Sequence, residues 1–405
     1  MAEIIHTGTL SRSIEKKLTM AKSRFIRRGN DTTIASIICG VVFCIFTFTF
    51  LYFYQSDLLT MEQHVLSNGL THYNRLVGAI ILTLLLQMLQ FGIDTATCRY
   101  TKHPSITYFI PTMLIAIFTD ISPQVDKGYT IGNWVWAAPL LLLVYTAITY
   151  VSASLLANTE GPNHKSVFRI LWENLLIMAV LITFACMASN TDKTFHQRMK
   201  IEKLISEAKY TDALSVGKRN TETDSSTTML RAYALSRTGL MGEKLFEYSL
   251  IGGSDAMLPN GKSVKTMLYS DTRIFNNVAR VMKQATRPIK YMEWMRSHGY
   301  AKKALNDYLL CGYLMDKEID KFARCLVCDP RYKHNCLPKH YKEAMVLYNH
   351  IRSTPIANYK NSVAEADYQD LQTIIKNTSD KAKRKALIQE AYGITYWYYW
   401  LYGKK

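Results

Sequence analysis

The residues best suited to chemistry lie close together in the segment CLVCDPRYKHNCLPKH, residues 325–340. A Cys-x-x-Cys pair is followed there by a third cysteine and two histidines, and thiolate and imidazole are ligands that zinc prefers. The candidate ligands are Cys325, Cys328, His334, Cys336 and His340. Because their spacing is cramped compared with that of a zinc ribbon or finger, we predict neither a metal nor a cofactor.

The same thiols have a simpler interpretation if they lie outside the cytoplasm, where cysteines are commonly oxidised. An even number of them permits three pairings, between which the sequence does not choose. The disulfide candidates are Cys311, Cys325, Cys328 and Cys336. Disulfides or free thiols are therefore expected ahead of zinc. Redox catalysis ranks last, because the βαβ context of a thioredoxin-like Cys-x-x-Cys is missing.

A second segment is suited to binding through its backbone. The stretch SLIGGSDAMLPNGKS, residues 249–263, contains three glycines and a proline. Successive N–H groups in such a loop can surround an anion. The residues of this candidate ligand site are Gly252, Gly253, Ser254 and Asp255. The alternative is an ordinary loop that crosses the helices, and the Gly-Lys-Ser/Thr ending of a nucleotide-binding loop is missing.

No recognised catalytic set is present. The sequence has no Gly-x-Ser-x-Gly, no His-Glu-x-x-His and no Walker loop. It therefore favours a protein that is not an enzyme, but a triad assembled from distant positions stays open.

These candidate residues belong to the second of two regions with very different compositions. Residues 33–189 are dominated by apolar runs, whereas residues 190–405 contain 36 Lys and Arg against 22 Asp and Glu. The predicted fold class is all-α. A basic N-terminus (1–32) precedes a bundle of about five transmembrane helices (33–189) and a soluble helical domain (190–405).

The five spans are predicted from runs of about 20 apolar residues, the length that crosses a bilayer. They cover residues 33–54, 76–93, 105–121, 134–157 and 167–188. The third is short and contains Pro111. The first is interpreted as an uncleaved anchor, because no small-residue cleavage site follows it.

Lys and Arg in the short loops predict the orientation, because they concentrate on the cytoplasmic side. One side holds Arg12, Lys16, Lys17, Lys22, Arg24, Arg27, Arg28, Arg99, Lys102, Lys165 and Arg169, and the other holds Arg75 and Lys127. The chain is therefore expected in the cytoplasmic membrane with its N-terminus inside and its C-terminal domain outside. That location excludes nucleic acid as a partner.

Few polar residues interrupt the spans. Gln87, Gln90 and Asp94 share one face of the second helix. They indicate either an ion or proton path or hydrogen bonds between helices. Glu173, which lies four residues after Arg169, can pair with it.

The soluble region resembles tetratricopeptide units in two stretches, LISEAKYTDALSVGK and LRAYALSRTGLMGEKLF. The family's small, Tyr and Ala positions are matched by Ala208, Tyr210 and Ala213, and a Tyr-x-x-Ala recurs at Tyr341 and Ala344. The second stretch departs from that pattern and the period is irregular. The resemblance therefore implies tetratricopeptide-like helical hairpins.

The whole chain also resembles an uncharacterised family of multi-pass membrane proteins from Bacteroidota. The stretches that carry this resemblance are TDSSTTMLRAYALSRTGLMGEKLFEY, GGSDAMLP and LPKHYKEAMVLY. It implies a location in the cell envelope and no particular activity.

The last helix, from Asp380 to the end, becomes almost wholly aromatic after Gly393. One interpretation is a helix that caps the domain, with Tyr392, Tyr396 and Tyr399 turned inward. The other adds that Trp397, Trp400 and the closing lysines touch membrane lipid, because Trp, Tyr and Lys favour that interface.

The sequence favours one function over another. We expect a membrane-anchored scaffold that presents its helical domain outside the cytoplasm to a protein or peptide partner of the envelope. The alternative is a membrane enzyme or transporter for an envelope lipid or glycan.

Overall fold

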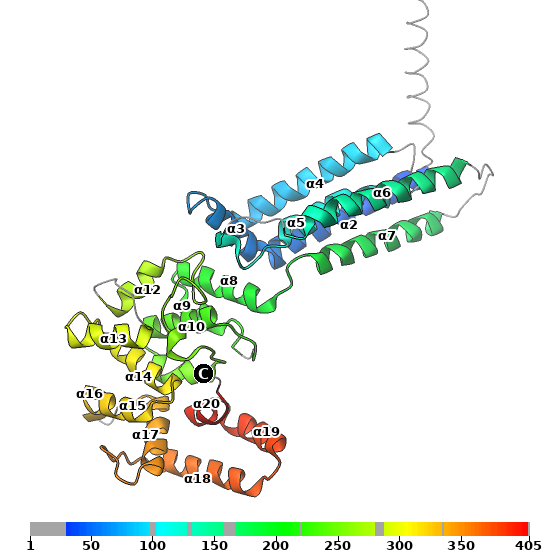
Figure 1. Cartoon of the computed structure of the whole chain (residues 1–405). Helices are drawn as coiled ribbons and strands as arrows, with labels where there is room; N and C mark the ends of the chain where they lie inside the picture. Colours follow the sequence, from blue (N-terminus) through cyan, green and yellow to red (C-terminus); the bar gives the residue numbers. More distant parts are fainter. Residues whose placement is uncertain are drawn as a thin grey trace, which may run out of the picture. The chain divides into compact units, whose positions relative to one another are not determined.

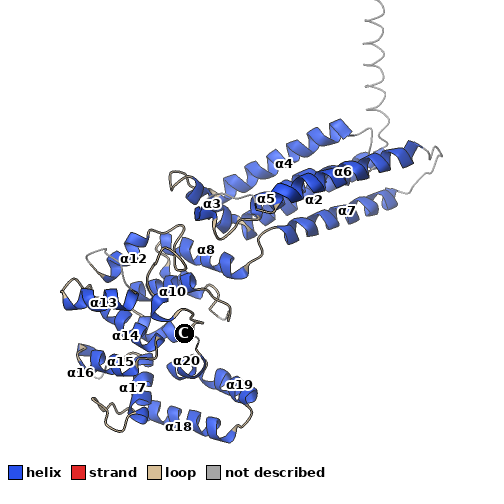
Figure 2. Ribbon diagram, in the orientation of Figure 1, coloured by secondary structure: helices blue, strands red, loops and turns tan. Residues whose placement is uncertain are grey.

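The structure is a computed structural model that describes residues 30–97, 103–127, 132–157, 167–218, 220–279, 287–333 and 336–403. Within these residues the regular elements are helices, and the only β-structure is a bridge between Ala279 and Ala301 (Figures 1 and 2). The all-α prediction is confirmed for this part of the chain. The chain divides into two compact units, Met1–Thr191 and Asp192–Lys405.

The first unit is a bundle of apolar helices. Its elements are α2 (Asn30–Thr49), η1 (Phe50–Tyr54), α3 (Ser56–Leu66), α4 (Arg75–Thr97), η2 (Pro104–Tyr108), α5 (Phe109–Thr119), η3 (Val125–Lys127), α6 (Trp134–Ala157) and α7 (Val167–Ala188). Among the residues that the structure describes, four helical stretches are long and apolar enough to cross a membrane: Thr33–Tyr54, Arg75–Thr97, Trp134–Val151 and Val167–Ala188. The chain is thus consistent with a membrane protein.

The predicted third span is a shorter apolar helix, Pro104–Thr119. It opens as the 3₁₀ turn η2 and continues as α5, with Pro111 in the first turn, where the missing N–H has no helical partner to lose. Its start bonds to α7 through Ser105 and Asn174. Its end accepts a bond at the Thr119 carbonyl from the Asn190 N–H, 3.0 Å away, just beyond α7. The segment therefore runs along α7 in the same direction.

Helix α4 shows how the bundle is polarised. Its buried stripe, at helical spacing, consists of Ala79, Thr83, Leu86, Gln90 and Asp94. The side chains that face outward are mostly large and apolar: Leu84, Leu85, Met88 and Phe91. Small and polar residues between helices with apolar residues outside are the arrangement expected in lipid.

The second unit is a helical domain with the opposite polarity. Its first helices are α8 (Lys193–Ser206), α9 (Tyr210–Ser215), α10 (Ser225–Thr238), α11 (Met241–Lys244), η4 (Leu245–Glu247), η5 (Gly253–Ala256), α12 (Asp271–Val278) and α13 (Pro288–Ser297). The remainder are α14 (Leu305–Met315), α15 (Ile319–Val327), α16 (Pro330–Lys333), α17 (Lys339–Ile351), α18 (Ser362–Asn377), α19 (Lys381–Tyr392) and α20 (Tyr396–Tyr402).

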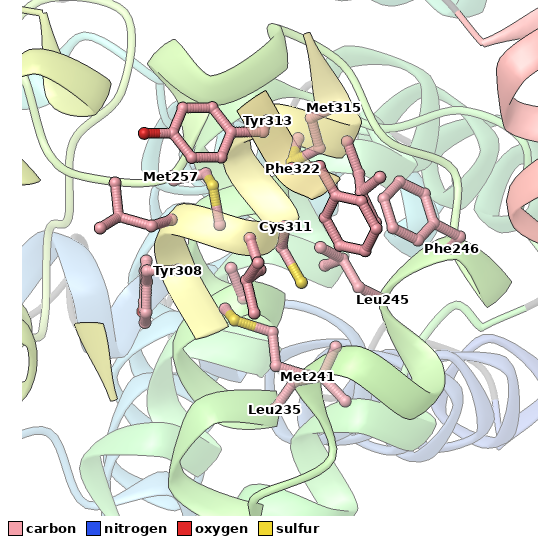
Figure 3. Packing of buried hydrophobic residues seen from close by; sticks show 14 of the residues in the cluster. Leu235, Met241, Leu245, Phe246, Met257, Tyr308, Cys311, Tyr313, Met315 and Phe322 are labelled. Atoms are coloured by element: carbon pink, nitrogen blue, oxygen red, sulfur yellow. The ribbon is translucent and has the colours of Figure 1, made fainter. Parts of the chain in front are cut away.

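Helix α14 is the centre of this domain, because nine of its eleven residues are buried. Figure 3 shows Met241, Leu245 and Phe322 packed around it, together with Met257. A helix that is apolar on every side must be surrounded by others. Gly312 leaves room for a side chain of α13, since a Cβ there would lie 2.9 Å from the Ile289 Cδ1.

The helices of this domain do not repeat a hairpin of constant length. Helix α8 has 14 residues and α9 has six, while α10 has 14 and α11 has four. The small residue Ala208 adopts φ 59°. Its N–H bonds to the Ile205 carbonyl and the next N–H to the Leu204 carbonyl, which closes α8 as a Schellman motif. The resemblance at Ala208 thus reflects a helix end rather than a regular tetratricopeptide repeat.

Candidate functional site

The polar residues predicted on α4 form a hydrogen-bonded cluster inside the bundle. The Gln87 Nε2 donates to the Gln90 Oε1 at 3.0 Å and to the Tyr108 hydroxyl at 3.4 Å. The Gln90 Nε2 donates to the Thr107 Oγ1 at 2.9 Å. These bonds hold η2 against α4 and agree with the interpretation as contacts between helices.

A second set of bonds joins η2 to α7. The buried Asn174 Oδ1 accepts from the Ser105 Oγ at 2.7 Å and from its N–H at 3.1 Å. The predicted pair is also present, because the Arg169 Nε lies 3.0 Å from the Glu173 Oε1. Buried polar side chains therefore link three elements of the bundle.

The glycine loop holds an anion, but the anion is part of the chain. Gly252 and Gly253 have φ 94° and 56°, so the loop curls left-handed. Its centre, Ser254, donates from N–H and Oγ to the two Asp316 carboxylate oxygens at 2.9 and 2.6 Å. Asp255 forms a two-point ion pair with Arg287, both distances 3.0 Å. In the structure, the donors of this candidate ligand site at Ser254 bind Asp316, and the loop ties η5 to the end of α14.

The cysteines do not form the predicted disulfides. All seven described cysteines are free, with Cys311 and Cys325 buried and Cys328 and Cys336 exposed. Burial raises the pKa of the Cys325 thiol, and the Arg296 guanidinium, 2.6 Å from the Sγ, offsets this only in part. The free-thiol alternative is the one that the structure has, and the Cys325 thiol stays protonated near neutral pH.

The candidate zinc ligands do not come together either. His334 lies outside the described residues, and among those described no three His, Cys, Asp or Glu side chains could hold a metal ion. His340 is fully buried, where its Nδ1 lies 2.9 Å from the Glu343 Oε2 and its ring packs on Phe246. It packs into the core instead of joining the cysteines.

The same segment contains an ion-pair network that sequence reasoning missed. The Arg331 guanidinium binds the Asp329 carboxylate at 2.7 Å and the Asp307 carboxylate at 2.6 Å. Asp307 also accepts a bond from the Tyr341 hydroxyl at 3.0 Å. Burial would raise the pKa of Asp329, but the bonds from Arg331 outweigh it and hold this pKa below its usual value. The Asp-Pro-Arg triplet was the only local signal.

The aromatic C-terminal helix α20 caps the domain. Tyr396 and Tyr399 are buried as predicted, and their hydroxyls donate to the Leu314 and Met315 carbonyls at the end of α14. Trp397 is 2% exposed and its indole N–H donates to the Glu343 carbonyl at 2.8 Å. Of the two interpretations of this helix, the structure has the capping one at Trp397, because the ring lies inside the domain. Trp400 is half-buried against Tyr396.

Exposed aromatic rings occur elsewhere, at the end of α13. Among the Phe, Tyr and Trp side chains described in the second unit, only Trp294 (47%) and Tyr300 (41%) are exposed. Trp294 stacks on His298 at 4.2 Å and on Tyr300 at 6.0 Å between centroids. Gly299, with φ 75°, closes a Schellman motif in which the Tyr300 N–H bonds to the Met295 carbonyl.

The fold and these sites define the chain as an all-helical protein with a bundle of apolar helices and a separate helical domain. A family model described as a family of unknown function (DUF6057) matches residues 276–403, from the end of α12 to α20. This match includes the exposed rings of α13, the Arg331 network and the stretch LPKHYKEAMVLY. No curated protein and no solved structure matches the chain.

Proposed function

We propose that this protein is a membrane-anchored scaffold whose helical domain binds a protein or peptide partner in the cell envelope. The observation that carries the proposal is the aromatic pair Trp294 and Tyr300, exposed in a domain whose other described aromatic side chains are at least half-buried. Exposed Trp and Tyr that are held rigidly are typical of the residues that dominate binding at protein interfaces.

The proposed location is the cytoplasmic membrane, with the N-terminus inside and the helical domain outside. It is supported by the excess of Lys and Arg in the loops of one side. It is also supported by the course of Pro104–Thr119, which runs along the bundle in the same direction as α7. A reporter that is active only outside the cytoplasm should be active when it is fused after Lys405. Activity of a reporter that works only in the cytoplasm, fused at the same position, would contradict this orientation.

The binding function is tested by site-specific photocrosslinking in the full-length protein. A photoreactive residue at position 294 or 300 should capture a discrete partner, which is then identified after purification in mild detergent. The matched control places the same photoreactive residue at position 381, where the native Lys381 is exposed on α19. Failure to capture a partner at 294, at 300 and at other exposed positions of the domain would contradict the proposal.

A second function, an enzyme or transporter for an envelope lipid or glycan, is supported by the polar cluster of Gln87, Gln90, Thr107 and Tyr108 inside the bundle. The two proposals differ in what Gln87→Leu with Gln90→Leu would do. A scaffold should still capture its partner at position 294. A transporter or enzyme should lose its activity in cells or vesicles while its domain stays folded.

A further inference from the structure

The exposed rings at the end of α13 are followed along the chain by basic side chains, whereas Glu293, which precedes them, is paired with Lys290 and accepts a bond from the Tyr313 hydroxyl. The ten residues from Trp294 to Lys303 include Arg296, Lys302 and Lys303 and no acidic residue. All three cationic side chains are exposed. A surface of this composition attracts anionic partners and repels cationic ones.

The geometry of this surface is fixed by bonds within the chain. The Lys302 N–H bonds to the Val278 carbonyl at 2.9 Å, next to the bridge between Ala279 and Ala301. The Schellman motif at Gly299 anchors the other side, on the buried Met295. A partner would therefore meet rings that are already ordered, which lowers the entropic cost of binding.

From these observations we infer that the surface formed by Trp294, His298, Tyr300 and Lys303 binds an acidic peptide segment with an apolar anchor side chain. This rests on the proposed function and names the chemistry of its partner. The apolar anchor contacts the stacked rings, while a carboxylate pairs with Lys303.

The arrangement favours a short acidic peptide over a long polyanion. Nucleic acid gains affinity from many phosphate contacts and from bases that stack on open ring faces. Here the rings cover part of one another, and the cations are few. The Lys302 ammonium is bound to the Asn276 carbonyl and the Arg296 guanidinium contacts the Cys325 Sγ, so each can make fewer further contacts. One apolar block with a few cations suits an acidic motif of a few residues.

The test measures fluorescence anisotropy of labelled peptides with the full-length protein in non-ionic detergent. The probe is a short peptide of Glu, Ser and Phe. One control peptide replaces Glu by Ser, and another replaces Phe by Ser. The probe should bind at least about tenfold more tightly than either control, equivalent to about 1.4 kcal/mol, and its affinity should fall as salt is raised.

Variants of the protein locate the site. Trp294→Ala and Lys303→Glu should each weaken binding of the probe by about tenfold. Lys381→Glu should not change it, because Lys381 belongs to α19, which Figure 1 shows apart from α13. Circular dichroism and thermal unfolding show that each variant is folded.

Three results would overturn the inference. They are equal binding of all three peptides, unchanged binding by Trp294→Ala and Lys303→Glu, or tighter binding of single-stranded DNA or a sulfated oligosaccharide through the same residues. If position 294 captures a partner in cells but Lys303→Glu leaves that capture intact, the inference that the partner segment is acidic is wrong, and the scaffold proposal stands. If no exposed position captures a partner, the scaffold proposal itself fails.

Discussion

Helices α4 and α14 are both rich in apolar residues but differ in which of their side chains they bury. Helix α4 buries Gln90 and Asp94 and turns Leu84 and Met88 outward. Helix α14 buries nearly everything, because other helices surround it. The difference shows that helical period alone does not say which face is inside, since that depends on whether the surroundings are lipid or water.

Each of the two units is also stabilised internally by a different kind of force. Apolar burial stabilises the domain in water. In lipid, the bundle gains nothing from that effect between its helices and depends on close packing and on hydrogen bonds such as the one from Gln90 to Thr107. Single substitutions in the domain core are therefore expected to cost more than substitutions in the polar cluster.

The largest effect is expected from Tyr396→Ala in α20. It removes a fully buried ring and the bond to the Leu314 carbonyl. The free energy of unfolding of the domain should fall by about 4 kcal/mol, measured by thermal unfolding of the full chain in detergent. Trp294→Ala is the control and should cost less than about 0.5 kcal/mol. An equal loss in both variants would refute the buried role of α20.

The next effect concerns the ion-pair network. Arg331→Met leaves the buried Asp329 without its counter-charge and should cost about 2 kcal/mol. The pKa of Asp329 is lower in the folded protein than its ordinary value of 3.8. The pair therefore contributes stability above about pH 4, and this contribution is lost as the pH falls through the folded pKa.

The free energy of unfolding, measured between neutral and acid pH, tests whether stability falls on acidification. The wild-type domain should lose stability on acidification more steeply than Asp329→Asn, which has no carboxyl to protonate at this position. A steeper loss in the variant would show that the network does not favour the ionised carboxylate.

A smaller effect of opposite sign is expected at the end of α8. Ala208 has φ 59°, a conformation that glycine adopts without steric cost. Ala208→Gly should therefore stabilise the domain by about 0.5 kcal/mol. Ala213→Gly is the matched control, because Ala213 is buried within α9 and its replacement should destabilise. Destabilisation by both changes would mean that Ala208 packs as a tetratricopeptide residue does.

An effect of similar size, but destabilising, is expected inside the bundle. Gln90→Leu removes the bond to Thr107 and should cost about 0.6 kcal/mol, measured by thermal unfolding of the full chain in lipid nanodiscs. Leu85→Gln places an amide on the outward face of α4 instead and should cost more. If Gln90→Leu cost as much as Tyr396→Ala, the contrast between the two units would be wrong.

The two aromatic segments show how far sequence reasoning reaches. The spacing of Tyr396 and Tyr399 predicted that they face inward, and they do. The composition around Trp397 left open whether this ring touches lipid, and in the structure its N–H donates to the Glu343 carbonyl inside the domain. At Trp294 the nearby chain offers stacking partners instead of a covering helix, and this ring remains exposed. The aromatic composition of a helix therefore does not determine which of its N–H and hydroxyl groups donate to an acceptor inside the domain.

The sequence by itself determined the helical class, the apolar runs and the helix caps, because these depend on residues a few positions apart. Asp380, where the last helix is predicted to begin, illustrates this, since it accepts the Ala382 N–H as the N-cap of α19. Only the tertiary structure decided that the anion in the Gly252–Gly253 loop is Asp316, and that Arg331 joins Asp307 to Asp329. The physical reason is that a charge or a polar hydrogen is satisfied by whichever partner the fold brings within about 3 Å, and partners such as Ser254 and Asp316 are far apart in the chain.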